Sequence, residues 1–377
     1  MDSFVQLMRE WPPGYGGVER VAHELASEWG STVFSFDAQS RSADEIDPLQ
    51  VCYPREVLPA SPPFGRLLLP LPSRALWSLL RSHRPLYGHL PSPGVLLVLL
   101  LARLLQPRRP VMAHWHCFVA PEPGSKNRLF AAYQWLALRV VPHLTKVITT
   151  SPVLAKELIR CGCQSARLDV LPCCLNAEQE KVLLALPSRT ATATPLRVLF
   201  IGRLDSYKRL DWLLEALALL NEPWSLSVVG DGPRRPAFEA LSAELFGASS
   251  EVNFLGRLDE TAKLAELASA DVLVLPSDRS TEAFGIVQLE AMAAGIPSLA
   301  FQNKRSGMGW VGQLTGLPWS QQPDELSLVL HQLATSPALR TALCIEARNR
   351  YLNLFARTVW LQSLDSIFPH NEDRVVT

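Results

Sequence analysis

The feature that most constrains the fold of this chain is an alternation of short apolar segments with longer segments of helical period, which runs through the chain twice. The first round opens with apolar residues 4–8, a loop that contains Gly14, Gly16 and Gly17, and a segment at 18–29 whose apolar side chains recur every three to four residues. Strand, glycine loop and helix in this order form the opening unit of a doubly wound parallel sheet.

The rest of the first round continues the same pattern. It predicts further strands at 31–36, 111–114 and 146–150 and helices at 129–140 and 152–160, the last following the capping candidate Ser151. A stretch of small and polar residues at 187–195 then reads as a linker. The first round therefore predicts one domain of the Rossmann type.

After the linker the alternation restarts. It predicts strands at 197–201, 224–229, 252–255 and 272–275 and helices at 209–220, 235–246 and about 284–294. At 377 residues the chain also exceeds the usual size of a single core. We predict an α/β fold of two doubly wound, Rossmann-like domains, residues 1–187 and 195–350, that face each other across a cleft. The segment 351–377 would form a C-terminal helix that could return to the first domain.

Composition excludes several classes of protein. Hydrophobic residues make up 48% and charged residues 19% of the chain, which is typical of a globular protein, and 36 basic residues balance 36 acidic ones. The balance gives no indication of nucleic-acid binding. Seven cysteines without CxxC spacing predict neither a disulfide framework nor a zinc site and fit a reducing compartment. With no run of about 20 apolar residues and no signal peptide, we expect a cytoplasmic protein.

One part of the first domain is basic and apolar at once. No Asp or Glu occurs between Glu56 and Glu122, and apolar runs lie at 67–71 and 95–101. The arginines of this stretch are Arg66, Arg74, Arg81, Arg84, Arg103, Arg108 and Arg109. Such a surface attracts anionic lipid headgroups, so we predict peripheral contact with the cytoplasmic face of a membrane. The alternative is a buried helix or strand at 95–105 flanked by ordinary solvated arginines.

The glycine loop of the first strand is a candidate phosphate site. Gly16 and Gly17 lack a Cβ, so the backbone can approach a ligand, and the helix start that follows favours an anion. The same glycines could serve only the turn. The GxGxxG spacing of dinucleotide enzymes fails at Glu19, which argues against a dehydrogenase.

A second candidate follows the first strand of the second domain. Arg203 comes directly after Gly202, and Lys208 lies five residues further on. Ligands of open α/β sheets bind beyond the carboxyl ends of the strands. Two cations there suit a diphosphate leaving group, whose negative charge grows as its bond to the sugar breaks. The alternative is a solvated basic loop.

A third candidate pairs Glu282 with Glu290, eight residues apart across a strand-to-helix turn. If the helix begins near Phe284, the backbone amides of Phe284, Gly285 and Ile286 are oriented to bind phosphate oxygens. Glu282 would then lie close to whatever the phosphate carries, and Glu290 could accept hydrogen bonds from ribose hydroxyls. The alternative is an acidic cap and an ordinary surface glutamate that stabilise the helix dipole.

Histidines form the last candidate group. His114 and His116 flank Trp115 at a predicted strand end, where alternation places both imidazoles on one face, and His89 precedes a Leu-Pro-Ser-Pro segment. An HxH pair can bind a metal, but no further ligand cluster accompanies it, so we predict no metal. His116 is the candidate polar group of the cleft, and His114 is more plausibly structural.

With these residues assembled, the chain resembles the retaining glycosyltransferases of family four, which have the GT-B fold. The resemblance covers nearly the whole chain. It rests on Pro13 with Gly16-Gly17-Val18-Glu19, His89-Leu90-Pro91-Ser92-Pro93, Trp115-His116, Thr150-Ser151-Pro152, residues 200–210, Val229-Gly230-Asp231-Gly232-Pro233, Phe254-Leu255-Gly256, and residues 270–277 leading into Glu282 and Glu290.

The resemblance implies a role for each candidate. Arg203 and Lys208 would neutralise the donor diphosphate in place of a metal ion, Glu282 would bind the donor sugar, and His116 would hydrogen-bond that sugar near the reacting carbon. The remaining donor-binding residues would be Gly16 and Gly17 at the diphosphate or acceptor side, Phe284, Gly285 and Ile286 at the phosphates, Glu290 at the ribose, and residues 230–233 with Arg257 near the nucleobase.

The implied reaction is transfer of a sugar from a nucleoside diphosphate sugar to a glycan acceptor with retention at the anomeric carbon, without cofactor or metal. Residues 306–317 resemble a subset that builds bacterial surface polysaccharides on lipid carriers, which implies a lipid-linked acceptor. One departure is Pro172-Cys173-Cys174, where the family usually has Pro-Asn-Gly.

Two other functions remain open on the sequence. An epimerase or dehydrogenase acting on nucleotide-sugars would need the GxGxxG loop that fails at Glu19. A non-catalytic membrane-associated relative would have lost Arg203, Lys208 or Glu290, all of which are present.

Overall fold

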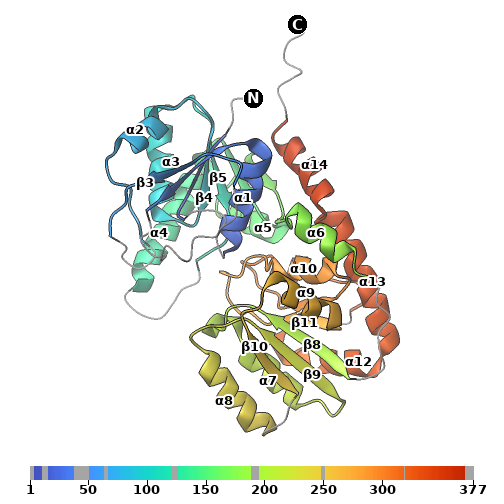
Figure 1. Cartoon of the computed structure of the whole chain (residues 1–377). Coiled ribbons are helices and arrows are strands. Elements are labelled where there is room, and N and C mark those ends of the chain that lie inside the picture. The colour runs from blue at the N-terminus through green and yellow to red at the C-terminus, as the bar shows by residue number, and fades with distance from the viewer. Residues whose placement is uncertain are drawn as a thin grey trace. The chain divides into compact units, whose positions relative to one another are not determined.

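The computed structural model of the chain describes residues 4–10, 16–37, 51–62, 67–119, 126–187, 195–247, 251–317 and 319–369. The chain folds into two compact units (Figure 1). Unit 1 consists of Met1–Pro172 together with Gln362–Thr377, and unit 2 consists of Cys173–Leu361. Each unit is an α/β fold built on its own parallel sheet.

Unit 1 contains a seven-stranded sheet with the strand order β3-β2-β1-β4-β5-β6-β7, and all neighbouring strands are parallel. The strands are β1 (Val5–Met8), β2 (Thr32–Phe36), β3 (Arg55–Leu58), β4 (Leu86–Leu90), β5 (Val111–Trp115), β6 (Lys146–Thr149) and β7 (Leu168–Val170). From β1 the strands that follow in the chain lie on one side of the sheet, and from β4 they lie on the other side. The topological switch point is therefore between β1 and β4. Open α/β sheets bind ligands at such a point.

The helices of unit 1 are α1 (Gly17–Trp29), α2 (Arg74–Arg81), α3 (Pro93–Leu105), α4 (Lys126–Val140) and α5 (Pro152–Arg160). Serine side chains cap three of them, as Ser73, Ser92 and Ser151 each accept a hydrogen bond from the backbone N–H three residues on. The sequence predicted α1, α4 and α5 to within three residues at each end. It left α3 undecided between helix and strand and missed α2, β3, β4 and β7.

Unit 2 contains a five-stranded parallel sheet with the order β10-β9-β8-β11-β12. The strands are β8 (Leu196–Ile201), β9 (Trp224–Val229), β10 (Val252–Gly256), β11 (Val272–Leu275) and β12 (Ser298–Ala300). The helices are α6 (Ala177–Leu184), α7 (Leu210–Ala218), α8 (Arg235–Phe246), α9 (Glu260–Ser269), α10 (Val287–Ala293), α11 (Met308–Val311), α12 (Leu326–Thr335) and α13 (Pro337–Leu354).

The sequence predicts that the first domain ends at residue 187, whereas unit 1 ends at Pro172. The helix α6 lies between these two positions. This helix packs within unit 2, where the Glu180 carboxylate accepts hydrogen bonds from the Tyr351 hydroxyl at 2.8 Å and the Arg357 backbone at 2.7 Å. The Arg348 guanidinium also donates to the carbonyl of Leu184 at 3.0 Å. Linker composition marks where a chain is extended, whereas such contacts decide which unit a helix joins.

The C-terminal segment is shared between the two units. The predicted single helix over residues 351–368 is interrupted near Phe355, and α14 (Arg357–Ile367) crosses the division at Leu361. Its end belongs to unit 1, where the Phe368 ring lies 5.2 Å from the rings of both Phe4 and Trp29. In the part of the chain that the structure describes, no helix is both long and apolar enough to cross a bilayer.

Candidate active site

The carboxyl ends of the central strands of unit 2 bring two candidate residues together. Lys208 lies on a 3-10 turn (Ser206–Lys208) after β8, and Glu282 lies in the loop after β11, the neighbouring strand. Their side chains form an ion pair and are only 9% and 16% exposed. Sequence analysis placed each residue separately at a strand end, and the sheet order makes them direct partners.

The charge of Lys208 is maintained despite burial. Desolvation by itself lowers the pKa of the Lys208 ammonium, but the Glu282 carboxylate, with contributions from Tyr207 and Asp205, outweighs it and the pKa is raised. A buried cation of this kind is held in place before a ligand arrives, which is what preorganised electrostatic stabilisation requires.

Arg203 differs from Lys208 although both belong to the loop after β8. The Arg203 side chain is 67% exposed, and its Nε lies 3.9 Å from the Asp205 carboxylate. The two predicted cations are therefore not an equivalent pair. Lys208 is buried and neutralised by Glu282, whereas Arg203 presents an open guanidinium to an incoming anion.

Glycines hold the neighbouring loops close to this one. A Cβ on Gly230, which has a φ of +130°, would lie 2.0 Å from the Gly202 carbonyl oxygen, and a Cβ on Gly232 would lie 2.4 Å from that of Leu204. The Gly230 amide donates to Gly256 at the end of β10 at 2.7 Å. Only glycine fits where backbones approach so closely.

The loops after β8, β9 and β10 therefore line one edge of the sheet. Arg257, the candidate residue near a nucleobase, directly follows β10 and is exposed. The predicted nucleobase segment at 230–233 follows β9 at the same edge. This arrangement places both predicted nucleobase elements beside the loop that carries Arg203.

The turn between Glu282 and α10 differs from its prediction. The helix begins at Val287 rather than near Phe284, because Gly285 adopts a left-handed φ of +73° that interrupts a right-handed helix. Among the described residues, the amides of Phe284, Gly285 and Ile286 donate to no backbone carbonyl. The Phe284 ring is buried against Phe355, with the ring centroids 5.9 Å apart. Three amide donors thus remain at this turn, held by loop geometry instead of a helix start.

Glu290 lies on α10 and is 2% exposed. One of its carboxylate oxygens lies 3.3 Å from Nζ of Lys263, a residue of α9 that sequence analysis did not identify. Lys263 also pairs with Glu260 at 3.0 Å. Nothing in the local spacing marks Lys263, because its importance comes only from the packing of α9 beside α10.

Gly16 and Gly17 form the start of α1 in unit 1. Gly16 is the N-cap residue, has no side chain to cap the helix, and is exposed like Gly17. A Cβ on Gly16 would lie 2.2 Å from the Glu19 carboxylate, so a side chain at this position would displace Glu19. Gly14 lies outside the described residues.

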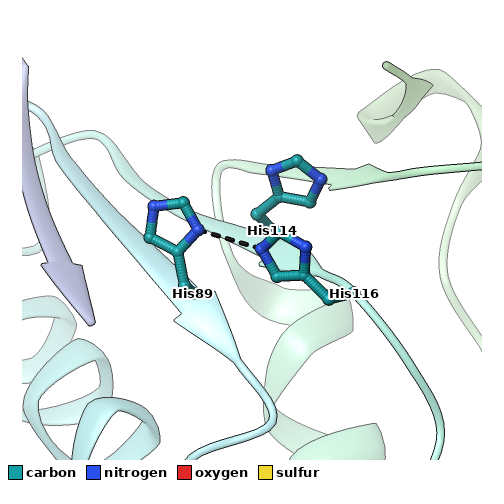
Figure 2. A group of neighbouring side chains, drawn as sticks. All are labelled: His89, His114 and His116. Atoms are coloured by element: carbon teal, nitrogen blue, oxygen red, sulfur yellow. Dashed lines mark hydrogen bonds between the residues drawn. The ribbon is translucent and has the colours of Figure 1, made fainter. Parts of the chain in front are cut away.

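Three histidines meet at the carboxyl ends of β4 and β5 (Figure 2). His89 pairs in register with His114, and His116 stacks on His114 with ring centroids 4.0 Å apart and ring planes at 15°. The sequence places only His114 and His116 on one face, and His89 joins them because β4 pairs with β5. Burial lowers the pKa of His89 to about 3 and that of His114 and His116 well below the usual value, so all three are neutral near pH 7.

These imidazoles also satisfy the spacing of a metal site, since one nitrogen from each lies within 4.8 Å of the others. Their orientation does not suit one. A metal ion lies in the plane of each imidazole that binds it, whereas the stacked rings of His114 and His116 occupy nearly parallel planes. His89 and His116 already share a hydrogen bond of 2.9 Å.

The basic, apolar stretch of unit 1 forms a surface on α2, α3 and α4. A groove of about 290 Å³ between α3 and α4 is lined almost entirely by apolar side chains, including Leu96, Leu97, Leu100, Leu129, Tyr133 and Leu136. Other large apolar side chains on these helices are exposed: Trp77, Leu104, Leu105 and Trp135. The helix α3 is thus buried on one face and exposed on the other.

The arginines of this stretch divide into two groups. Arg74 and Arg81 on α2 and Arg108 after α3 are exposed. Arg109 is buried and donates to two backbone carbonyls, and Arg84 bonds to Thr32 and to the carbonyl of Phe4. Arg109 and Arg84 hold unit 1 together instead of facing solvent. Arg103 belongs to neither group, since it is half-buried and donates to the Pro107 carbonyl, and Arg66 lies outside the described residues.

Two family models match successive parts of the chain. A family model described as Glycosyltransferase Family 4 matches residues 15–179, and one described as Glycosyl transferases group 1 matches residues 195–322. The phosphatidyl-myo-inositol mannosyltransferase of Mycobacterium leprae is 39% identical over 107 residues, which are 27% of this chain and 27% of its own. The D-rhamnosyltransferase WbpZ of Pseudomonas aeruginosa is 26% identical over 76% of this chain and 73% of its own. The chain thus spans about a quarter of the first relative.

Solved structures give the same fold over nearly the whole chain. HepE of Anabaena in complex with UDP superposes with a TM-score of 0.74 at 19% identity, covering 97% of this chain and 98% of HepE. The same protein has been solved with UDP-glucose, with a TM-score of 0.71. Two parallel α/β units with this likeness constitute GT-B architecture.

Proposed function

We propose that this chain, which belongs to the glycosyltransferases of family 4, transfers a sugar from a nucleoside diphosphate sugar to a glycan acceptor. The observation that carries the proposal is the buried ion pair of Lys208 with Glu282 at the carboxyl ends of adjacent central strands. Around it lie the exposed Arg203, the amides of the 284–286 turn, and the glycine loop at 230–232. The complexes of HepE with UDP and UDP-glucose support a uridine nucleotide as the first donor to test.

The roles follow from the position and charge of each group. As the bond between the anomeric carbon and the phosphate oxygen breaks, that oxygen keeps the bonding electrons and the negative charge on the diphosphate grows. Arg203 and Lys208 meet this charge together with the amides of Phe284, Gly285 and Ile286. Glu282, released from part of its bond to Lys208, accepts hydrogen bonds from the donor sugar.

The remaining candidates bind the rest of the donor. Glu290 accepts from the ribose, and residues 230–233 with Arg257 contact the nucleobase. Gly16 and Gly17 present the start of α1, and His116 hydrogen-bonds the sugar. The acceptor hydroxyl attacks from the face that the phosphate leaves, which retains the anomeric configuration. Its proton passes to the departing phosphate oxygen, so the products are the glycoside and the nucleoside diphosphate. No metal ion is needed because protein cations neutralise the diphosphate.

A thermal-shift series tests donor binding. UDP, ADP, GDP and their glucose conjugates are added to the whole chain in the presence of EDTA. A ligand at one hundred times its dissociation constant stabilises the folded state by about 2.7 kcal/mol. We expect one nucleotide to raise the melting temperature, Arg203→Ala to weaken that shift, and the exposed control Arg167→Ala to preserve it. No shift with any of these nucleotides would contradict the proposal.

A transfer assay tests the chemistry. The binding nucleotide, conjugated to candidate sugars, is incubated with lipid-linked and free glycan acceptors, and the anomeric configuration of the product is read by NMR. An inverted product would refute retention while leaving donor binding intact. Activity that survives EDTA and disappears in Lys208→Ala is expected.

We further propose that the acceptor is lipid-linked and that unit 1 approaches it through the α2–α4 surface. This surface combines exposed Trp77, Leu104 and Trp135 with exposed Arg74 and Arg81. Cationic and apolar groups together suit the headgroups and the acyl boundary of an anionic bilayer. The groove between α3 and α4 offers apolar lining for part of a lipid chain.

Co-sedimentation with vesicles tests this surface. Replacing Arg74 and Arg81 with Gln removes two charges worth about 1 kcal/mol each near an anionic membrane. We expect the partition coefficient onto phosphatidylserine vesicles to fall about thirtyfold. The double control Arg160→Gln/Arg167→Gln removes two exposed charges from another part of unit 1. Equal binding of the two double variants would rule out a specific role for α2.

A further inference from the structure

A line of hydrogen bonds joins four side chains of unit 1 and ends at His116. The Gln6 amide on β1 donates through Nε2 to the Ser31 hydroxyl at 2.7 Å. Its Oε1 lies 2.8 Å from Nε2 of His89 on β4. Nδ1 of His89 lies 2.9 Å from Nε2 of His116, the bond drawn in Figure 2. All four side chains are buried.

The hydrogen bond between Gln6 and Ser31 fixes the donor and the acceptor of each further bond in the line. Because the amide NH2 of Gln6 donates to Ser31, its Oε1 faces His89 and can only accept. His89 must therefore carry its proton on Nε2. A neutral imidazole has a single N–H, so Nδ1 of His89 is an acceptor and the proton of its bond to His116 resides on Nε2 of His116. Nδ1 of His116 is left with the lone pair.

Burial makes this assignment stable over a wide pH range. The pKa of His89 is lowered to about 3 by desolvation, and the pKa values of His114 and His116 are lowered well below the usual value by desolvation and by one another. Protonation therefore does not scramble the two tautomers near neutral pH. In the part of the chain that the structure describes, no group is hydrogen-bonded to Nδ1 of His116.

We propose that Gln6 and His89 are positioning residues that fix His116 in the Nε2–H tautomer, so that its Nδ1 accepts a hydrogen bond from a sugar hydroxyl. The part that concerns the sugar rests on the proposed function. His89 and His116 are candidates on the sequence, whereas the positions of Gln6 and His89 in this line are visible only in the structure. A neutral imidazole can carry its proton on either nitrogen. The hydrogen bonds from Gln6 through His89 select one of these tautomers and so define which nitrogen of His116 accepts.

The tautomer is measured directly by NMR. Long-range ¹H–¹⁵N correlation spectra of the histidine-labelled whole chain distinguish a nitrogen that carries a proton from one that does not. In the wild type we expect a proton on Nε2 of both His89 and His116. A proton on Nδ1 of His116 would overturn the proposal, and so would stoichiometric Zn²⁺ shifting the signals of all three histidines, since the cluster would then be a metal site.

Variants test what sets the tautomer. Gln6→Leu and His89→Phe each interrupt the line, and we expect His116 to show both tautomers in either variant. His89→Gln restores an acceptor oxygen and should rescue the wild-type signal. Tyr87→Phe is the matched control, because its hydroxyl bonds to Nδ1 of His114 at 3.0 Å without joining the line. An unchanged His116 in both Gln6→Leu and His89→Phe would refute the positioning role.

Activity supplies the second readout. We expect His89→Phe to lower kcat/KM about tenfold, the usual effect of losing one buried hydrogen bond, and His89→Gln to recover most of it. The wild-type spectrum is recorded without substrate, so its result stands even if no nucleotide-sugar binds unit 2. Conversely, donor binding with the wrong His116 tautomer would refute only the positioning role.

Discussion

At the residue scale, the ion pair of Lys208 and Glu282 decides most about the candidate site. Both side chains are nearly buried, so each one is tolerated because the other is present. Removing one partner leaves a buried charge without its counterion. The pair is therefore expected to matter both for stability and for chemistry, and the two contributions can be separated.

A double-mutant cycle separates them. Lys208→Met should cost about 3 kcal/mol of the free energy of unfolding because Glu282 is left charged and buried. The double variant Lys208→Met/Glu282→Gln should recover most of that loss, as measured by urea denaturation. Turnover should stay reduced by a factor of about 10²–10³ in both, because the cation that meets the diphosphate is missing. Restored turnover in the double variant would show that Lys208 only maintains the fold.

Gly230 provides a second prediction at this scale. Gly230→Ala places a methyl group 2.0 Å from a backbone oxygen at a φ of +130°, and we expect a loss of more than about 2 kcal/mol. Gly30→Ala is the matched control, since its φ is also positive at +57°, in the left-handed helical region, but nothing lies within 4 Å of the new Cβ. It should cost about 1 kcal/mol. Equal midpoints of thermal unfolding would mean that the loop after β9 moves away from Gly202 freely.

At the scale of elements, neighbouring strands create groups that neither strand contains alone. The histidine cluster exists because β4 and β5 pair in register, with His89 opposite His114. The neutral state of the cluster is likewise a property of the buried strand ends. The three imidazoles face one another, the Tyr87 hydroxyl and the Gln6 amide.

Stability should accordingly depend on pH. The pKa values of these histidines are lower in the folded than in the unfolded chain, so the unfolded state takes up protons first as the pH falls below about 6.5. The stabilisation is complete above that pH and is lost on acidification, by about 2 kcal/mol for each histidine at pH 5. Urea midpoints from pH 7 to pH 5 should fall less steeply in His89→Gln, which has one such group fewer. Parallel curves would indicate that His89 becomes protonated in the folded state.

At the scale of the whole molecule, segments far apart in the chain, around Phe4 and around Phe368, meet within unit 1. The Phe368 ring packs on Phe4 and Trp29, and Nζ of Lys146 donates to the Ile367 carbonyl at 2.9 Å. Unit 1 is therefore completed only after unit 2 has been synthesised. This order of assembly follows from the division of the chain at Pro172 and Gln362.

Truncation of the Phe368 side chain tests this completion. We expect Phe368→Ala to destabilise unit 1 by about 2 kcal/mol through loss of aromatic packing, with little effect on unit 2. Leu352→Ala, an exposed position on α13 of unit 2, is the control and should change little. Hydrogen exchange of β1 and β9 amides reports the two units separately. Faster exchange in β9 alone would contradict the assignment.

The sequence by itself determined the class of fold and the positions of the candidate loops. Apolar periodicity predicted most of the strands and about half of the helices, because it depends on residues close together in the chain. The rule that ligands bind at the carboxyl ends of strands placed Arg203, Lys208 and Glu282 at one edge of a sheet. Tertiary structure alone decided the partners. The pairing of Lys208 with Glu282, of Lys263 with Glu290, and of His89 with His116 joins residues from different elements. The register and order of strands set such contacts, and local sequence carries no record of them.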